Sequence, residues 1–265
     1  MRFSKASIFT ICLSVIISEK ASAQMSAREI MQKVEDQAKV QTQVTKSKMV
    51  LTNKTGKTRE REVTRYQKDQ KGVGGIDAKM LIFFEFPTDI RGTGLLLWQY
   101  TDVKKDDDRW LYLPALKKVR RIAGESKNEY FMGTDFTYDD IGGRELDEDT
   151  HKLLGTEEIT GVKCYKIEAI PVKADDTYGR RLIWVIPEKW VAFKVEFYNK
   201  SGTLIKVLQA DDVRNVNGIW MAFDLLMKNF SENHQTRLTI TECRNNVPLK
   251  DEIFTTATLE RGKVQ

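Results

Sequence analysis

Residues 191–197 read VAFKVEF, and residues 219–227 read IWMAFDLLM. In the first stretch every second residue is apolar, while Lys194 and Glu196, which lie between them, are charged. The second stretch has the same two-residue period, with Asp224 among the apolar residues. Because side chains alternate between the two faces of a β-strand, both stretches predict strands with one apolar face and one hydrated face.

This period recurs along most of the chain in short segments separated by turn signals such as residues 53–56 (NKTG) and 199–202 (NKSG). The predicted strands are residues 42–52, 57–67, 80–86, 94–101, 109–113, 161–170, 180–186, 191–199, 204–213, 219–229 and 236–244. About eleven strands with short turns predict a large antiparallel meander. Residues 24–265 contain no linker rich in Pro, Gly or Ser and no internal repeat, so we expect a single domain there.

One helix precedes the strands. Residues 26–29 (SARE) have the form of a capping box, and apolar residues follow at helical spacing up to Ala38. A sheet this wide curls, and its apolar concave face needs a cover. The N-terminal helix and a short segment near residues 128–134 are the available covers. Two interpretations stay open: a hollow interior for a lipid-like ligand, or an ordinary filled β core.

The first 23 residues have the features of a secretory signal peptide. Arg2 and Lys5 precede a short apolar run, SIFTICLSVIIS at residues 7–18, and Ala21-Ser22-Ala23 has the small-x-small form of a cleavage site. We therefore expect an exported protein that begins at Gln24 after cleavage. Retention of the apolar run as an anchor is the alternative.

Composition and motifs argue against several functions. The 43 basic residues nearly balance the 38 acidic ones, so binding of nucleic acid is not indicated. His151 and His234 are the only histidines and neither has a neighbour at metal-ligand spacing, so we predict no metal, no cofactor and no His-based triad. The sequence has no G-x-S-x-G motif, which leaves an exported esterase as a remote alternative to a protein without catalytic residues.

Two cysteines remain in the expected mature chain, Cys164 and Cys243. A disulfide between them is allowed in an oxidising compartment. Buried free thiols on separate strands are the alternative, because the sequence does not place their Cα atoms.

Two central stretches resemble a known family. They are WLYLPALKKVRRI, from Trp110 to Ile122, and FMGTDFTYDD, from Phe131 to Asp140. Both resemble the outer-membrane lipoprotein-sorting protein family, a LolA-like group of periplasmic proteins. Residues 86–87 (FP), 91–94 (RGTG) and 254–255 (FT) also look like the family, and the resemblance covers about residues 27–262.

The resemblance implies a mainly β (α+β) fold in which a curved antiparallel sheet forms a half-open barrel. The N-terminal helix and a short helical lid would enclose a hydrophobic cavity. It also implies a periplasmic carrier or chaperone that shuttles lipoprotein acyl chains or other lipid-like cargo toward the outer membrane. Such a carrier would work with an inner-membrane transporter of the resistance-nodulation-division type. An envelope sensor or interaction module on the same fold is the alternative.

The predicted cavity lining consists of large apolar residues on the strands, for which plain core packing is the alternative. These residues are Phe84, Phe86, Trp98, Trp184, Ile186, Phe193, Phe197, Met221 and Phe223. The predicted lid consists of Tyr130, Phe131, Met132, Gly133 and Phe136, with Gly133 supplying backbone freedom. A fixed core plug is the alternative for this segment.

Charged residues predict one further surface. Lys117, Lys118, Arg120 and Arg121 form a basic run. This run could meet anionic lipid headgroups or an acidic transporter surface, or it could be a solvated hairpin flank. The acidic pairs at residues 139–140 and 211–212 are expected to be surface charge rather than acid–base or cation sites.

Overall fold

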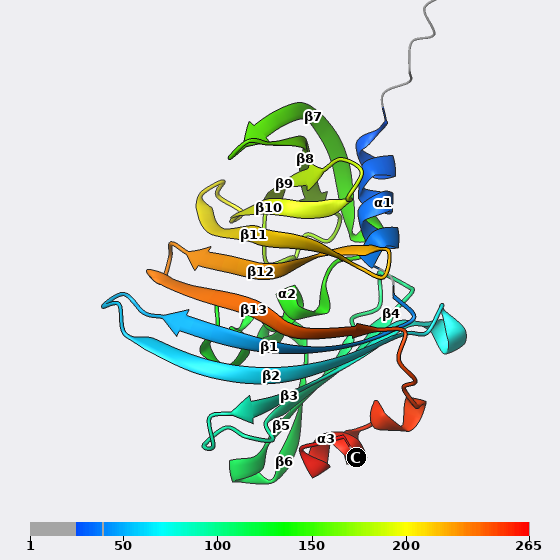
Figure 1. The fold of residues 1–265 in the computed structure, drawn as a ribbon, viewed down its shortest axis with the longest axis vertical. Helices are drawn as coiled ribbons and strands as arrows, with labels where there is room; N and C mark the ends of the chain where they lie inside the picture. Colours follow the sequence, from blue (N-terminus) through cyan, green and yellow to red (C-terminus); the bar gives the residue numbers. More distant parts are fainter. Residues whose placement is uncertain (1–24, 39, 265) are drawn as a thin grey trace, which may run out of the picture.

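The computed structural model describes residues 25–38 and 40–264, so the predicted signal peptide at residues 1–23 lies outside the described part. All thirteen described strands belong to one antiparallel sheet, accompanied by three α-helices and short 3-10 turns (Figure 1). None of the described helices is long and apolar enough to cross a membrane.

The strands are β1 (Thr42–Thr52), β2 (Thr58–Asp69), β3 (Ile76–Phe86), β4 (Gly94–Tyr100), β5 (Asp108–Leu113), β6 (Lys118–Ile122), β7 (Asp149–Ile159), β8 (Val162–Pro171), β9 (Arg180–Ile186), β10 (Val191–Tyr198), β11 (Leu204–Val216), β12 (Ile219–Asn229) and β13 (His234–Asn245). The helices are α1 (Ala27–Ala38), α2 (Tyr138–Gly142) and α3 (Thr256–Arg261).

The sheet consists of two meanders that are joined edge to edge. Its strand order is β6-β5-β4-β3-β2-β1-β13-β12-β11-β10-β9-β8-β7, so pairing of β1 with β13 connects the β1–β6 half to the β7–β13 half. Strands β6 and β7 form the two free edges, and the chain between them crosses from one edge to the other, with α2 in the hollow of the sheet (Figure 1). The predicted curved, half-open antiparallel sheet is confirmed.

The sequence-based prediction missed β6 and β7, which are the two edge strands. The sequence of β6 is KVRRI, and that of β7 is DTHKLLGTEEI, in which most side chains are exposed or half-buried. Edge strands often carry charged side chains, which protect an unpaired edge against aggregation. The apolar alternation that identifies the other strands is therefore weak in these two.

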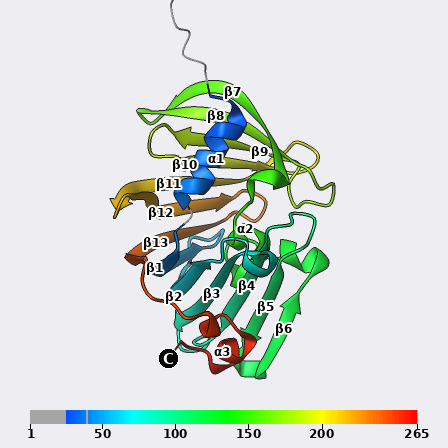
Figure 2. The same cartoon turned by 90° about the vertical axis from the view of Figure 1, so that its right-hand side faces the viewer.

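Helix α1 lies across the hollow side of the β7–β13 half (Figure 2). Its predicted capping box is confirmed: Glu29 Oε2 accepts a hydrogen bond from the Ser26 amide at 2.7 Å, and the Glu29 amide donates to Ser26 Oγ at 3.2 Å. Ala27 and Ile30 are buried in a cluster with Ile167 on β8 and Val185 on β9. The amphipathic pattern therefore places one helix face on the sheet.

The β1–β6 half is covered on both faces. Even-numbered β3 residues such as Phe84 pack in a cluster with Phe131, while Phe83 faces the opposite side and packs with Phe254 and Leu259 from the C-terminal segment. The approach is close at Gly94 on β4, where an added Cβ would lie 2.7 Å from a side-chain carbon of Leu259. Apolar residues on both faces of β3 and β4 thus have a partner.

Candidate ligand cavity

A cavity of about 530 Å³ lies between α1, the concave face of the sheet and the segment around α2. This volume falls within the range of about 300–1,000 Å³ that is usual for small-molecule sites. Its apolar wall comes from α1, from the strands and from the α2 segment. The apolar residues that line it are Met31, Val34, Val40, Ala78, Met80, Phe136, Ile141, Leu146, Ile183, Ala192, Val195, Phe197, Leu208 and Met227.

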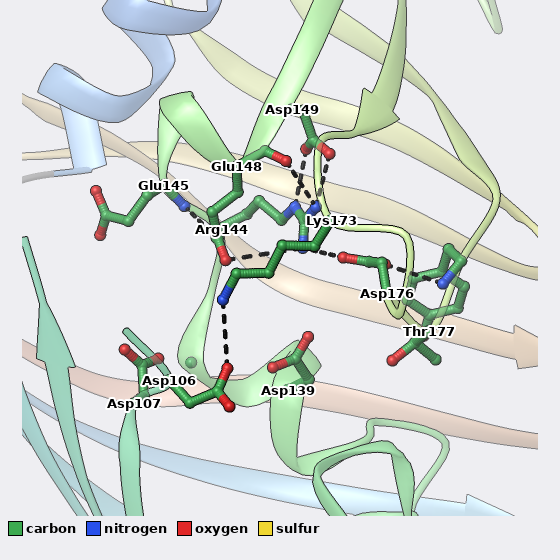
Figure 3. Close-up of polar contacts among 12 residues, drawn as sticks. Asp106, Asp107, Asp139, Arg144, Glu145, Glu148, Asp149, Lys173, Asp176 and Thr177 are labelled. Atoms are coloured by element: carbon green, nitrogen blue, oxygen red, sulfur yellow. Dashed lines mark hydrogen bonds and ion pairs between the residues drawn. The ribbon is translucent and has the colours of Figure 1, made fainter. Parts of the chain in front are cut away.

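One side of the cavity is closed by a network of ion pairs. Arg144 lies between two buried carboxylates, at 2.7 Å from Asp149 and 2.6 Å from Asp176 (Figure 3). Arg181 on β9 contacts the same two carboxylates, at 3.2 Å and 3.3 Å. These pairs tie the segment after α2 to the loop between β8 and β9, so the wall on this side is held by electrostatic contacts rather than by a hydrophobic seal.

A second buried ion pair anchors the α2 segment to the sheet. Lys206 on β11 is 2% exposed, and its Nζ lies 3.0 Å from Asp140 Oδ2. The Tyr178 hydroxyl donates to the same carboxylate at 2.9 Å, and burial together with this negative charge raises the pKa of Tyr178. Asp139 pairs with the buried Arg109 at 2.9 Å. The prediction that residues 139–140 are surface charge is therefore wrong, whereas Asp211 and Asp212 are exposed as expected.

The predicted lid segment is packed firmly. Phe131 is wholly buried, and its ring centroid lies 5.4 Å from that of Phe84 and 5.6 Å from that of Tyr138. Met132 and Gly133 both have positive φ values, of 50° and 74°, at the turn that follows. Phe136 reaches the cavity wall, and the Tyr130 hydroxyl accepts a hydrogen bond from Asn229 at 2.9 Å. The geometry favours the fixed plug over a loosely held lid.

The turn of this segment is also tied to β13. The Asp135 carboxylate is 2% exposed and accepts a hydrogen bond from the Thr236 hydroxyl at 2.6 Å. The His234 ring nitrogen Nδ1 lies 2.7 Å from the same carboxylate. Asp135 stands in the FMGTDFTYDD stretch that resembled the family, but no spacing in the sequence indicated its partner some 100 residues away.

Among the predicted cavity residues, Phe197 lines the cavity. Trp184 and Ile186 lie on the other face of β9 from Ile183, since the Trp184 indole is flanked by Lys166 and Lys194 and donates to Glu157 at 3.2 Å. The predicted row on β10 is broken by a β-bulge between Ala192 and Lys194. Phe193, at the bulge, therefore belongs to the cluster of Trp184 and not to that of Phe197.

The remaining predicted residues lie elsewhere. Phe84 contacts the plug, and Phe86 is 44% exposed. Trp98 donates its indole hydrogen to the Phe254 carbonyl at 3.1 Å, beneath the C-terminal segment. Met221 lies 3.5 Å, sulfur to sulfur, from Cys243, and Phe223 lies under the guanidinium of Arg214. Strand alternation predicted these as apolar positions but did not show which part of the chain covers each of them.

The basic run lies on the edge strand β6 and the turn before it. Lys117, Lys118, Arg120 and Arg121 are all exposed. Arg121 pairs with Asp108, and Arg120 lies 3.7 Å from Glu129, so two of the four charges have an acidic neighbour. Cys164 on β8 is buried and Cys243 on β13 is half-buried, and both are free thiols.

Two titratable groups near the cavity have shifted pKa values. Burial raises the pKa of Asp107 to about 6, although Arg109 lies 3.1 Å away and opposes the shift. Burial also lowers the pKa of His151, which lines the cavity. Within residues 25–38 and 40–264, no three His, Cys, Asp or Glu side chains form a group that could hold a metal ion.

Comparison with known proteins identifies the class of this fold. A family model described as an uncharacterized protein matches residues 76–261. The chain is 30% identical to a DUF1329 family protein from Desulfovibrio piger, with a TM-score of 0.84 and coverage of 88% of this chain and 97% of that one. It is 28% identical to an outer membrane lipoprotein-sorting protein domain from Vibrio parahaemolyticus, with a TM-score of 0.83 and coverage of 89% and 98%.

A LolA superfamily protein from Nitrosomonas europaea shares the fold at 18% identity, with a TM-score of 0.68 and coverage of 89% of this chain and 100% of that one. No curated protein matches the chain significantly in sequence. The structure is thus a LolA-like half-open barrel with a covered cavity. The chain belongs to the DUF1329 family. Its fold confirms the resemblance to outer-membrane lipoprotein-sorting, LolA-like proteins that the two central stretches predicted.

Proposed function

We propose that the protein is a periplasmic carrier or chaperone that holds a lipoprotein acyl chain or other lipid-like cargo in the cavity and shuttles it toward the outer membrane. The observation that carries this proposal is the cavity of about 530 Å³ beneath α1. The likeness to an outer membrane lipoprotein-sorting protein domain and the LolA-like fold support the same role. An inner-membrane transporter of the resistance-nodulation-division type is the proposed partner that loads the cargo.

Such a carrier needs an apolar surface that shields the acyl chain of its cargo from water and so offsets the free-energy cost of exposing that acyl chain. Each buried CH₂ contributes about 0.8 kcal/mol, so a long acyl chain requires on the order of 10 kcal/mol of compensation. The continuous wall formed by Met31, Ile183, Val195, Leu208 and Met227 supplies a surface of this kind. Release then requires a membrane or receptor that binds the chain better than the cavity does.

The test uses a fluorescent fatty acid whose emission increases in an apolar environment. The wild-type protein should bind the probe, and Ala192→Phe, which places a ring in the cavity, should weaken binding at least tenfold. Ala123→Phe, at an exposed position, is the matched control and should bind as the wild type does. A probe that stays silent with the wild-type protein would contradict the proposal.

Transfer distinguishes a carrier from an envelope sensor on the same fold. A carrier loaded with the probe should deliver it to acceptor vesicles faster than the probe dissociates spontaneously into buffer. A sensor would bind the probe without this acceleration, since nothing would couple its release to a membrane.

A further inference from the structure

One guanidinium that lines the cavity has no acidic partner. Arg65 on β2 lies on the concave face, and its Nη2 donates to Gln43 Oε1 at 2.8 Å. Among the described residues, no carboxylate lies within ion-pair distance of it. Burial lowers the pKa of Arg65. Arg65 is half-buried, and a guanidinium that is partly removed from water without a counter-charge carries a desolvation cost that no ion pair offsets.

The other cavity-lining arginines differ from Arg65 in this respect. Arg144 lies 2.7 Å from Asp149, and Arg181 lies 3.2 Å from the same carboxylate. The buried Lys206 close by is paired with Asp140 at 3.0 Å. Each of these cations therefore has a carboxylate as its counter-charge. The hydrogen-bond partner of Arg65 is instead the neutral side-chain amide of Gln43.

The wall around Arg65 is polar on three neighbouring strands. Residues that stand opposite one another in an antiparallel ladder share a face, and Arg65 stands opposite Thr45 on β1, which in turn stands opposite Cys243 on β13. One step along, Gln43 is buried, and its Nε2 donates to Asn245 Oδ1 at 2.9 Å. These side chains make the concave face polar beside the cavity, and Arg65 is the residue among them that lines the cavity itself.

The opposite wall carries most of the apolar lining residues, next to the ion pair of Arg181 and Asp149. Val34 on α1 faces a wall that includes Ile183, Val195, Leu208 and Met227 from strands β9 to β12. The cavity therefore runs from a polar wall on β2 and β3, where Arg65 lies with Gln67, Asp69 and Asp77, to the mainly apolar wall beneath α1.

We infer that the cavity selects a single-chain amphiphile with an anionic headgroup, with the chain beneath α1 and the headgroup on Arg65. A carboxylate or a phosphate would satisfy the guanidinium by the same charge-assisted fork of hydrogen bonds. The volume of about 530 Å³ suits one small ligand. This inference rests on the proposed function, because it names the class of cargo that the same cavity prefers.

The experiment compares a fluorescent fatty acid with its methyl ester, which keeps the chain and removes the charge. The wild-type protein should bind the acid about tenfold more tightly than the ester, as expected for one charge-assisted contact. Arg65→Gln should lose this preference by weakening the acid and not the ester. Arg59→Gln, which removes an exposed charge from the same strand, should keep the preference.

Thermal unfolding provides a second measurement. Without ligand, Arg65→Gln should unfold no earlier than the wild type, because it removes an unpaired desolvated charge. With the fatty acid added, the wild type should gain more in Tm than the variant does. A variant that is destabilised without ligand would indicate a structural role for Arg65 and would contradict the inference.

The outcomes separate this inference from the proposed function. Equal binding of acid and ester by the wild type, or a preference that survives Arg65→Gln, would overturn the inference and leave the carrier proposal standing. Failure of both probes to bind would overturn both. Protection by inorganic phosphate alone, equal to that by the fatty acid, would identify a free-anion site and overturn the selection of an amphiphile. The same assay with a single-chain alkyl phosphate in place of the fatty acid tests whether the protein recognises the headgroup by its charge alone.

Discussion

The two halves of the sheet use the same antiparallel meander but differ in how their faces are covered. In the β1–β6 half, five consecutive residues of β3, from Met80 to Phe84, are buried, as are the first four of β4. The plug around Phe131 fills the concave side of this half, and Phe254 and Leu259 cover the other side. In the amino-acid sequence, strands that are buried on both faces appear as nearly continuous apolar runs.

In the β7–β13 half the cover is thinner. Alternate residues of β10, including Val195 and Phe197, are buried while their neighbours are half-buried, and α1 is the main element above them. A single helix does not fill the hollow of a curved sheet, so most of the apolar strand residues of the cavity wall lie here, and the cavity extends from this half to β2, β3 and β4. A filled and a hollow region can thus arise in one sheet from the amount of chain that covers each half.

The strongest test of this difference is Phe131→Ala. If the plug is part of the filled half, truncation should cost about 3–5 kcal/mol in the free energy of unfolding, because it leaves a cavity in a closed cluster. Probe affinity per folded molecule should stay unchanged. Denaturant unfolding and the fatty-acid probe measure the two quantities.

The matched variant is Met31→Ala on α1, in the hollow half. Met31 is half-buried and lines the cavity, so its truncation should weaken the probe and cost less stability than Phe131→Ala does. If Phe131→Ala instead changed affinity with little loss of stability, the segment would be a lid and the division between filled and hollow halves would fail.

A second test concerns Asp107, which precedes β5 and pairs with Arg109. The pKa of Asp107 is about 6 in the folded protein against an ordinary value of 3.8, so its ionised form disfavours folding. The resulting loss of folding stability is absent below pH 4, develops as the pH rises through 6 and is complete at pH 7.5. Asp107→Asn should therefore stabilise the protein by about 1–2 kcal/mol at pH 7.5, and the difference should vanish at pH 4.

The neighbouring Asp106 provides a control of opposite sign. Its burial is outweighed by the ammonium groups of Lys127 and Lys173, which lower the pKa of Asp106. The contact of Lys173 with Asp106 is shown in Figure 3. Asp106→Asn should therefore lose stability above pH 4 rather than gain it. Urea unfolding curves at several pH values measure both variants, and parallel pH profiles for Asp107→Asn and the wild type would contradict the prediction.

The smallest effect on stability is expected at the free edge of the filled half. Reversal to Glu of Lys117, Lys118, Arg120 and Arg121 should weaken docking to anionic vesicles or to the transporter. Thermal stability should change little, because exposed ion pairs contribute less than about 1 kcal/mol each. Vesicle cosedimentation at low salt measures docking.

The control for this reversal is the other free edge. Lys152 on β7 and Lys163 on β8 are exposed, and their reversal to Glu should leave docking nearly unchanged. Docking that survives reversal of the basic run would show that the β6 edge is a solvated surface. Docking that is lost equally in the control would show a general charge effect.

Some features of the site could not be predicted from the sequence. A bulged residue shifts the strand alternation by one, so the predicted row on β10 placed Phe193 with Phe197, and the structure separates them. Asp140 looked like surface charge because its partner, Lys206, is distant in the chain. Nor did any local pattern indicate that Arg65 lines the cavity without a counter-charge.

The sequence by itself determined the features that depend on neighbouring residues: the turns, the capping box of α1, the strands with clear alternation and the two stretches that resemble LolA-like proteins. Tertiary structure decided which strands are edges, because only the pairing of β1 with β13 sets the strand order. It also decided which apolar face is filled and which lines a cavity. The reason is physical: alternation records that a face is buried, while the partner that buries it comes from a distant part of the chain.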